Sequence, residues 1–292
     1  GEEPSVLQPI AYKYDLDIQI SFSPGSPDQT ELDDYYIVDI PEEQLDQVGA
    51  IIADLQGIPE VDWVEPNEQI NIDPITADKL RKVNRRFGIN DPGLEQLWGF
   101  EAMKVDALYQ FISSTGVKPA RKALIAILDT GVDGQHEDLQ AHYRSLNPSD
   151  DNDPKGHGTH CAGIAGAVSN NGLGIASFSL GADFVEITSI KVLNASGMGS
   201  QRSIINGMIK AADAGAAVIS LSLGGLSNQS RERAYKKAVE YAHKKGSIVV
   251  AAAGNANRNA KNFVPAGVDG VISVSALDEE LQRAVFSNYI TD

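Results

Sequence analysis

The sequence has little cysteine, no long apolar run and, in its first quarter, almost no positive charge. One of its 292 residues is cysteine, Cys161, so an internal disulfide is excluded. No apolar run approaches the roughly 18–20 residues of a membrane-spanning helix. Residues 1–78 contain 19 acids and one base, a net charge of −18, whereas residues 79–292 have a net charge of +2. The missing basic face argues against nucleic-acid binding, and the uneven charge predicts two structural units.

The start of the chain gives no targeting signal. Gly1-Glu2-Glu3 is not the basic start of a signal peptide. A single cysteine is compatible with a cytoplasmic protein and also with many exported bacterial ones. We expect a secreted or periplasmic location from which a targeting segment has been removed, with a cytoplasmic location as the open alternative.

The acidic segment has the pattern of a small folded unit. Asp15–Phe22 alternates as a half-buried strand does, and Tyr35–Ile40 predicts a second strand. Pro41 is placed to begin a helix that Gly57 ends, and Val61–Ile70 reads as a further extended segment. The helix has an apolar face at helical spacing, formed by Leu45, Val48, Ile51, Ile52 and Leu55. We predict a small α+β domain of ferredoxin-like type over residues 1–72.

Residues 73–90 are predicted to be a linker. Five bases fall within eight residues of it: Lys79, Arg81, Lys82, Arg85 and Arg86. Such a basic run forms either a solvated helix or loop, or an exposed segment open to proteolytic cutting.

The remainder, residues 91–292, has the pattern of a parallel sheet. Short apolar runs typical of strands buried on both faces are Ala123–Leu128, Ala216–Leu221, Ile248–Ala253 and Val271–Val274. Helical stretches lie between them at Ser203–Ala214 and Arg231–Lys245, each followed by a glycine. This alternation predicts an open, doubly wound, mainly parallel α/β sheet, in which active sites gather beyond the carboxyl ends of the strands.

Chemically capable side chains stand at those strand ends. Asp129 follows the first run and Asn255 follows the third, while His157 opens a helix rich in small residues. A carboxylate beside an imidazole is the orienting half of a nucleophilic triad, and an amide can donate to an oxyanion. Alternatives are a turn role for Asp129 and a zinc site at His157 and His160, although no His-Glu-x-x-His pattern is present. A nucleotide-binding enzyme is disfavoured, because Gly156–Gly163 lacks the Gly-x-Gly-x-x-Gly spacing.

Three blocks of the sequence resemble those of the subtilisin-like serine proteases, in the same order. They are Asp129-Thr130-Gly131-Val132, His157-Gly158-Thr159-His160 and Ala253-Gly254-Asn255. The likeness extends from about Asn90 to the end of the chain, and the acidic segment resembles the inhibitory propeptide of the family. It implies a serine endopeptidase proform that consists of a propeptide (1–72), a linker with the processing region (73–90) and a catalytic domain (91–292). Polypeptide substrates and the propeptide itself would be its partners.

The resemblance also assigns roles to individual residues. Asp129 would be the triad acid, His157 the general base and Asn255 the side-chain donor of the oxyanion hole. Gly197-Met198-Gly199 and Ser222-Leu223-Gly224 resemble the two edges that pair with an extended substrate. The pocket for the residue before the cut would be lined by Ala251, Ala252, Ala253 and Gly254.

The sequence departs from the family at the nucleophile. No Gly-Thr-Ser block occurs, and the chain stops at residues that resemble the family shortly before that block. We therefore expect the catalytic domain to be incomplete at its C-terminus, with the serine on a separate fragment or removed by shortening. The alternative is a pseudoprotease that binds or regulates a partner without catalysis.

Two further features follow from the resemblance. Residues 168–175 resemble the calcium loop of the family, with a plain Asn-Gly turn as the alternative. The implied ligands are Asp91, Asp138, Val168, Asn171, Leu173 and Ile175. Cys161, four residues after His157, resembles the cysteine of the proteinase K branch and is predicted to lie one turn beneath the histidine as a small buried residue.

Overall fold

The computed structural model describes residues 5–67, 69–71, 87–180 and 184–291. In the N-terminal part it has the elements α1 (Gln8–Tyr14), β1 (Asp17–Ile20), β2 (Tyr36–Asp39), α2 (Val48–Gln56) and β3 (Gln69–Asn71). The larger part begins with α3 (Trp98–Ala102), α4 (Val105–Thr115), β4 (Ala123–Asp129), α5 (His157–Gly166), β5 (Val185–Lys191), β6 (Met198–Ser200) and α6 (Gln201–Asp213). It continues with β7 (Val218–Leu221), β8 (Gly225–Leu226), α7 (Gln229–Lys244), β9 (Ile248–Ala252), β10 (Phe263–Val264) and β11 (Val271–Val274).

The larger part is built on a parallel sheet in the order β11-β9-β7-β4-β5. The four apolar runs form β4, β7, β9 and β11, so the predicted doubly wound α/β fold is confirmed. The edge strand β5 was not predicted from the sequence. Its run is interrupted by Glu186, Thr188 and Ser189, which hides the strand from a search for continuous apolar residues.

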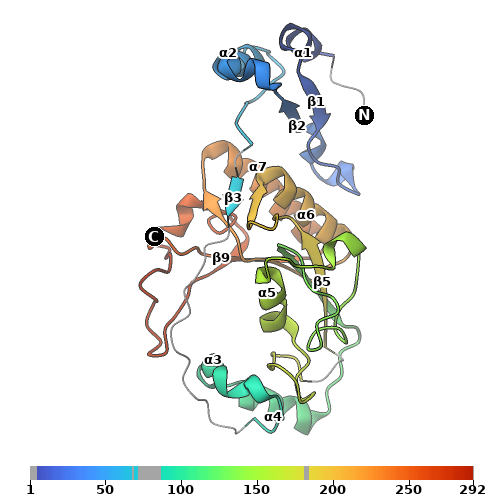
Figure 1. The fold of residues 1–292 in the computed structure, drawn as a ribbon, viewed down its shortest axis with the longest axis vertical. Helices are drawn as coiled ribbons and strands as arrows, with labels where there is room; N and C mark the ends of the chain where they lie inside the picture. The colour runs from blue at the N-terminus through green and yellow to red at the C-terminus, as the bar shows by residue number, and fades with distance from the viewer. Residues whose placement is uncertain (1–4, 68, 72–86, 181–183, 292) are drawn as a thin grey trace.

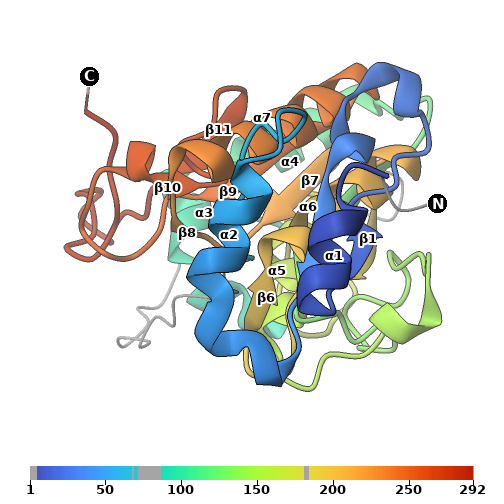
Figure 2. The same cartoon turned by 90° about the horizontal axis from the view of Figure 1, so that it is seen from above.

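Helices cover both faces of this sheet (Figures 1 and 2). Leu124, Ala126 and Leu128 of β4 pack in one core with residues of α6 and α7. Ile125 and Ile127 point to the opposite face, into a second core with Ala162 of α5. The sheet is therefore buried on both sides at β4, as its unbroken apolar run predicts.

The two predicted helices of this part are confirmed as α6 and α7, and both have well-defined ends. The Ser200 side chain accepts the Ser203 N–H at 3.1 Å, which caps α6, and Asn228 caps α7 through the Arg231 N–H at 2.9 Å. The glycine after each helix has a positive φ, 77° at Gly215 and 86° at Gly246, as a helix-terminating position requires.

The N-terminal part forms a small α+β unit with its own core, which includes Leu7, Tyr14, Ile18, Ile51 and Leu55. β1 and β2 pair antiparallel, whereas β3, in the described residues, pairs with β6 of the larger part and not with β1 or β2. The ferredoxin-like arrangement thus stays a prediction.

Two local predictions in this unit need correction. The segment after Pro41 begins as a 3-10 helix (Glu42–Gln47), and α-helix starts only at Val48. Leu45 is consequently 58% exposed and does not belong to the apolar face. Helix α1 was not predicted, because seven residues that include a proline give too short a pattern.

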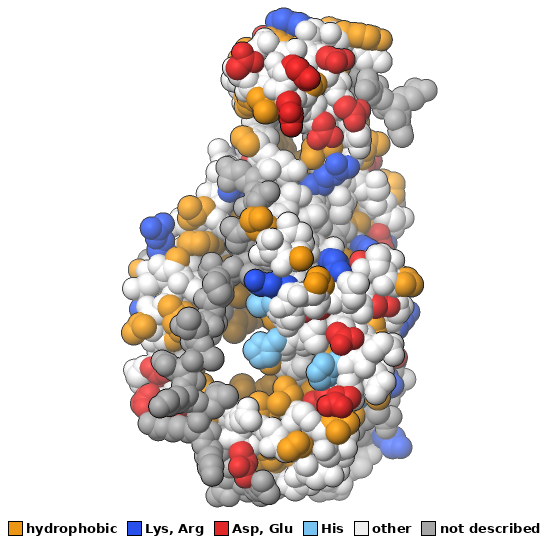
Figure 3. Space-filling model, viewed as in Figure 1, with side chains coloured by type: hydrophobic (Ala, Val, Ile, Leu, Met, Phe, Trp, Pro, Cys, Tyr) orange, Lys and Arg blue, Asp and Glu red, His pale blue; other side chains and the backbone are white. Residues whose placement is uncertain are grey.

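The two parts share a hydrophobic core, with the N-terminal unit seated over α6 and α7 (Figure 1). Phe22 and Leu32 of the N-terminal unit are 2% and 0% exposed and pack in the same cluster as the apolar residues of α6 and α7. Figure 3 shows acidic side chains on the outer surface of this unit and basic side chains near its junction with the larger part.

The predicted linker is described only in part, because residues 73–86 lie outside the described residues. Among the described helices, none is both long and apolar enough to cross a membrane.

Candidate active site

The alternation of side chains along β4 determines where Asp129 points. Ile125 and Ile127 face α5, and Asp129 continues that series at the carboxyl end of the strand. Its side chain is completely buried. The carboxylate is therefore directed at the start of α5, which covers this face of β4.

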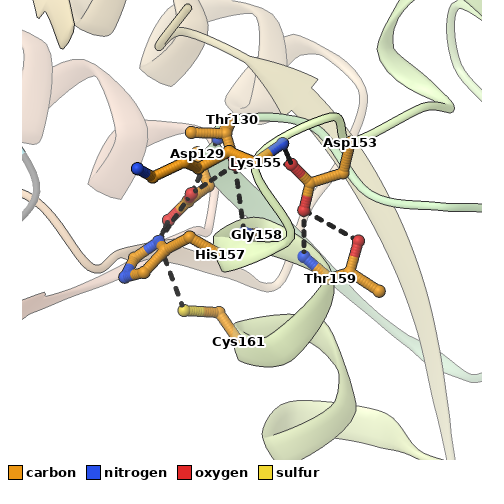
Figure 4. Close-up of polar contacts among 8 residues, drawn as sticks. All are labelled: Asp129, Thr130, Asp153, Lys155, His157, Gly158, Thr159 and Cys161. Atoms are coloured by element: carbon orange, nitrogen blue, oxygen red, sulfur yellow. Dashed lines mark hydrogen bonds and ion pairs between the residues drawn. The ribbon is translucent and has the colours of Figure 1, made fainter. Parts of the chain in front are cut away.

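His157 is the first residue of that helix. Its Nδ1 lies 2.7 Å from Asp129 Oδ1 and 2.9 Å from Oδ2 (Figure 4). The other ring nitrogen, Nε2, points away from the carboxylate (Figure 4). Gly158 permits this approach, since a Cβ there would lie 2.0 Å from the carbonyl oxygen of Gly131. The predicted pairing of Asp129 with His157 is thus present in the structure.

The carboxylate alters the protonation of the imidazole. The hydrogen bond to Asp129 raises the pKa of His157 above its ordinary value, with a further contribution from Cys161, although burial opposes the shift. Folding therefore favours the imidazolium. The stabilisation it provides is complete below about pH 6.5, the unfolded value, and is lost as the pH rises through the higher folded pKa.

Two predictions near His157 have different outcomes. Cys161 Sγ lies 4.0 Å from His157 Nδ1, one turn further along α5, as predicted, but the residue is half-buried rather than buried. His160, the second histidine of the alternative zinc pair, has an exposed side chain. Position 160 faces away from the sheet on which Cys161 and Ala162 pack.

Among the described residues, the cluster with metal-ligating side chains close together is Asp129, His157 and Cys161, not the pair His157 and His160. Since His157 Nδ1 already binds Asp129, the arrangement is that of an acid–base pair.

The predicted substrate edges lie on either side of an extended segment from the N-terminal unit. Met198 and Gly199 belong to β6, which pairs antiparallel with β3, with Ile70 opposite Gly199 and Asn71 opposite Met198. Ser222, Leu223 and Gly224 connect β7 to β8, and β3 also lies against β8. The backbone of β3 thus occupies the position predicted for a bound peptide.

The segment predicted to line the pocket follows the alternation of β9. Ala251 and Ala253 are buried in separate cores, whereas Ala252 is exposed. A pocket at this place would consequently be lined by the Ala252 side chain, Gly254 and the backbone of the two buried alanines. Gly254 has φ 101°, a conformation that favours glycine.

Asn255 follows Gly254 at the same edge of the sheet as Asp129, and Asn288 holds its loop. The Asn288 side chain is completely buried, accepts the N–H groups of Ala256 and Arg258 at 3.0 and 2.9 Å, and donates to the Ala253 carbonyl at 2.8 Å. This anchor was missed from the sequence. An asparagine 33 positions after Asn255 has no local pattern that would identify it.

The residues predicted to bind calcium lie together around loop 168–175. Asp91 accepts the Asn170 N–H at 2.7 Å, and Asp138 accepts the Ile175 N–H at 2.8 Å and the Asn171 side-chain amide at 2.9 Å. Both carboxylates are buried. Burial raises the pKa of Asp138 in spite of these hydrogen bonds, and the charge of Asp91 adds to the shift.

Known proteins are similar to this chain over most of its length. The model of the subtilase family matches residues 120–291, which is more than half of the chain. Thermitase from Thermoactinomyces vulgaris is 41% identical over 68% of this chain and 69% of its own length. A thermophilic serine proteinase from a Bacillus species is 35% identical over 85% of this chain, which spans only 57% of that protein.

A solved structure of proteases from Pseudoalteromonas arctica also has a similar fold. It matches with a TM-score of 0.57 at 27% identity and covers 69% of each chain. The likeness agrees with the parallel sheet and its flanking helices.

The raised pKa of His157 leads to a test of the pair. In Asp129→Asn the imidazole loses the carboxylate, the largest contribution that raises its pKa, so the pKa should fall toward its ordinary value of about 6.5. NMR titration of histidine-labelled protein measures this directly. Asp151→Asn is the control, because Asp151 binds the Tyr143 hydroxyl instead. Equal His157 pKa values in wild type and Asp129→Asn would contradict the pairing.

Proposed function

This chain belongs to the subtilase family, and on that premise we propose that the complete protein is a serine endopeptidase with Asp129 and His157 as its acid–base pair. The observation that carries the proposal is the hydrogen bond from His157 Nδ1 to a buried carboxylate, with Nε2 directed away from it. The nucleophile would be a serine outside these 292 residues, in keeping with the absence of a Gly-Thr-Ser block.

The proposed chemistry is acyl transfer to that serine. As its Oγ attacks the carbonyl carbon of the substrate, the hydroxyl proton moves to His157 Nε2, and Asp129 stabilises the resulting imidazolium. The same proton then passes to the departing amine, and a water molecule repeats the sequence to release the acid. The Asn255 side chain would donate to the oxyanion, a contribution of about 10²–10³ in turnover, which is the magnitude established for the corresponding asparagine in this family.

Part of the apolar sheet face is exposed, and this is evidence for a further polypeptide segment beside the Asp129–His157 pair. Ile248, Ile272 and Val274 are 50%, 53% and 51% exposed. The strand register places them on the same face as Ile125 and Asp129, the face that α5 covers at β4. An apolar sheet face next to a catalytic pair is expected to be covered. We propose that the polypeptide with the serine covers it, whether as a continuation of the chain or as a separate C-terminal fragment.

The N-terminal unit, residues 1–72, is proposed to be an inhibitory propeptide that keeps the enzyme a zymogen. Its β3 segment supplies the antiparallel backbone pairing to β6 that a substrate would make. Residues 73–90 would contain the site of autoprocessing, and 91–292 would be the catalytic domain. Phe87 packs with Phe100 in a separate core, which supports a cut between Asn71 and Phe87.

A second set of contacts, separate from the pairing of β3 with β6, supports stable docking of this unit. Arg202 of α6 donates to the Ile20 carbonyl oxygen at 3.0 Å. Asn206 of the same helix donates to the Ser21 carbonyl oxygen at 2.8 Å. Asp213 accepts the Gly25 N–H at 2.8 Å. These bonds surround the buried Phe22, so release of the unit would expose an apolar site on α6 and α7.

We also propose a structural calcium ion at loop 168–175. Asp91 and Asp138 would contribute carboxylates and Asn171 its side-chain oxygen, while Val168, Leu173 and Ile175 would contribute carbonyl oxygens. Two buried carboxylates, those of Asp91 and Asp138, face the same loop, so the donor set fits a hard cation. The ion would stabilise the loop and take no part in the reaction.

A proform kept inactive by its own N-terminal unit suits an enzyme that is activated outside the cytoplasm. We therefore propose a secreted or periplasmic location. A pseudoprotease remains the second candidate function, favoured by the absence of a Gly-Thr-Ser block from the sequence.

Autoprocessing tests the protease against the pseudoprotease. In the complete protein, the wild type should release an N-terminal fragment and give a new N-terminus between Asn71 and Phe87, detected by N-terminal sequencing. His157→Ala should stay intact, whereas His160→Ala, which alters an exposed histidine of the same helix, should be processed normally. Activity in a form that retains Gly1 would contradict the proform.

The calcium proposal predicts a shift in thermal stability. A ligand at about 100 times its dissociation constant adds roughly 2.7 kcal/mol, so a chelator should lower the Tm of the wild type by about 5–10 °C. In Asp138→Asn the chelator should have little effect, while the exposed substitution Asp269→Asn should behave as the wild type. A wild-type Tm that does not respond to the chelator would refute the site.

A further inference from the structure

The helix that carries His157 has no cap of its own. Its N-cap is Gly156, which has φ 83° and no side chain to accept the first N–H groups. The Asp153 carboxylate takes this place, because its Oδ2 accepts both the backbone N–H and the hydroxyl of Thr159 at 2.8 Å (Figure 4). Asp153 therefore holds the first turn of α5 from outside the helix.

The other oxygen of the same carboxylate reaches the loop that follows β4. Asp153 Oδ1 accepts the Thr130 hydroxyl at 2.7 Å and the Lys155 N–H at 3.2 Å. Thr130 is buried, its backbone N–H donates to Asp129 Oδ1 at 2.7 Å, and its Oγ1 accepts the Gly158 N–H at 3.2 Å. One side chain thus links the residue after Asp129 with the residues after His157.

The Thr130 hydroxyl has a single proton and two possible acceptors. Its oxygen lies 2.7 Å from Asp153 Oδ1 but 3.2 Å from Asp129 Oδ1, so the proton goes to Asp153. Without Asp153 the hydroxyl would turn to Asp129 Oδ1, the oxygen that accepts His157 Nδ1 at 2.7 Å. Because this oxygen already accepts the Thr130 N–H and the imidazole, a third donor there would compete with the imidazole.

Asp153 is ionised in this role. Burial raises its pKa, but the donors from Thr159 and Thr130 outweigh burial, and the pKa is lowered. Its oxygens are engaged with donors of the chain itself, which distinguishes it from a residue that contacts the substrate.

We propose that Asp153 is a positioning residue for the Asp129–His157 pair. Its carboxylate caps the helix that carries the imidazole, orients the Thr130 hydroxyl, and so fixes the acid and the base relative to one another. The proposal rests on the proposed role of His157 as the base, but it can be tested without the nucleophile.

The test uses NMR on the 292-residue chain and follows the His157 Nδ1 proton and amide exchange at Thr159. In Asp153→Asn, amide exchange at Thr159 should accelerate about tenfold, the ratio expected for a lost cap. The His157 Nδ1 proton signal should also shift and broaden. Thr130→Val should reproduce the change at His157, and the double variant should add little to it, because both residues act through one hydroxyl.

The matched control is Asp133→Asn. Asp133 lines the same surface cavity of about 320 Å³ as Asp153, but its carboxylate accepts the Gln135 N–H and does not contact Thr130. Its backbone N–H donates to Thr159 Oγ1, a bond that the substitution leaves in place, so the variant reports the effect of removing a nearby charge. If Asp153→Asn changes the His157 signal no more than Asp133→Asn does, Asp153 is only a helix cap and the proposal is wrong.

Kinetics of the complete enzyme separate this inference from the proposed function. Asp153→Asn should lower kcat about tenfold or more with little change in KM, since the substrate is not contacted and only the catalytic pair is misplaced. An inactive wild type would refute the proposed protease while the NMR result still decides the role of Asp153. A raised KM with unchanged kcat would overturn the positioning role.

Discussion

The hydrogen bond between Asp129 and His157 is the interaction on which the rest of the site depends. It exists because the two-residue period of β4 sends Asp129 to the face that α5 covers, and because Gly158 lets that helix approach the strand. Burial of the carboxylate makes the interaction strong, and among the described residues its donors come from the imidazole and from Thr130. Cap, loop and strand therefore form one unit that fixes the carboxylate and the imidazole relative to one another.

The acidic and basic residues of the chain meet at the junction between its two parts. The acidic N-terminal unit lies against helices that present Arg202, Lys237, Lys244 and Lys245, each of which bonds to it. Lys237 pairs with the Glu31 carboxylate, whereas the other three donate to carbonyl or hydroxyl oxygens. Because an exposed ion pair contributes little stability, the burial of Phe22 and Leu32 is the larger contribution to docking. On the proposed function, the acidity belongs to the part that is discarded and the nearly neutral remainder is the catalytic domain.

Functional residues could be predicted from the sequence where a reactive side chain stands next to a regular pattern of residues. Asp129 could be found because an acid directly follows an unbroken apolar run, and His157 because small residues surround it in a short block. β5 escaped because polar residues interrupt its pattern, and Leu45 misled because a 3-10 turn has a different period from an α-helix. Asp153 and Asn288 act through hydrogen bonds between segments that only the fold brings together. Residues of this supporting kind leave no periodic signal, so a single sequence does not reveal them.

On the proposed function, Asp129 and His157 activate a serine, and identifying that serine is the decisive measurement. The complete protein would be treated with a fluorophosphonate, which labels activated serines, and the labelled residue mapped by mass spectrometry. We expect one labelled serine outside residues 1–292, within a Gly-Thr-Ser block, and loss of the label in His157→Ala. A labelled serine within these residues, or labelling that persists in His157→Ala, would contradict it.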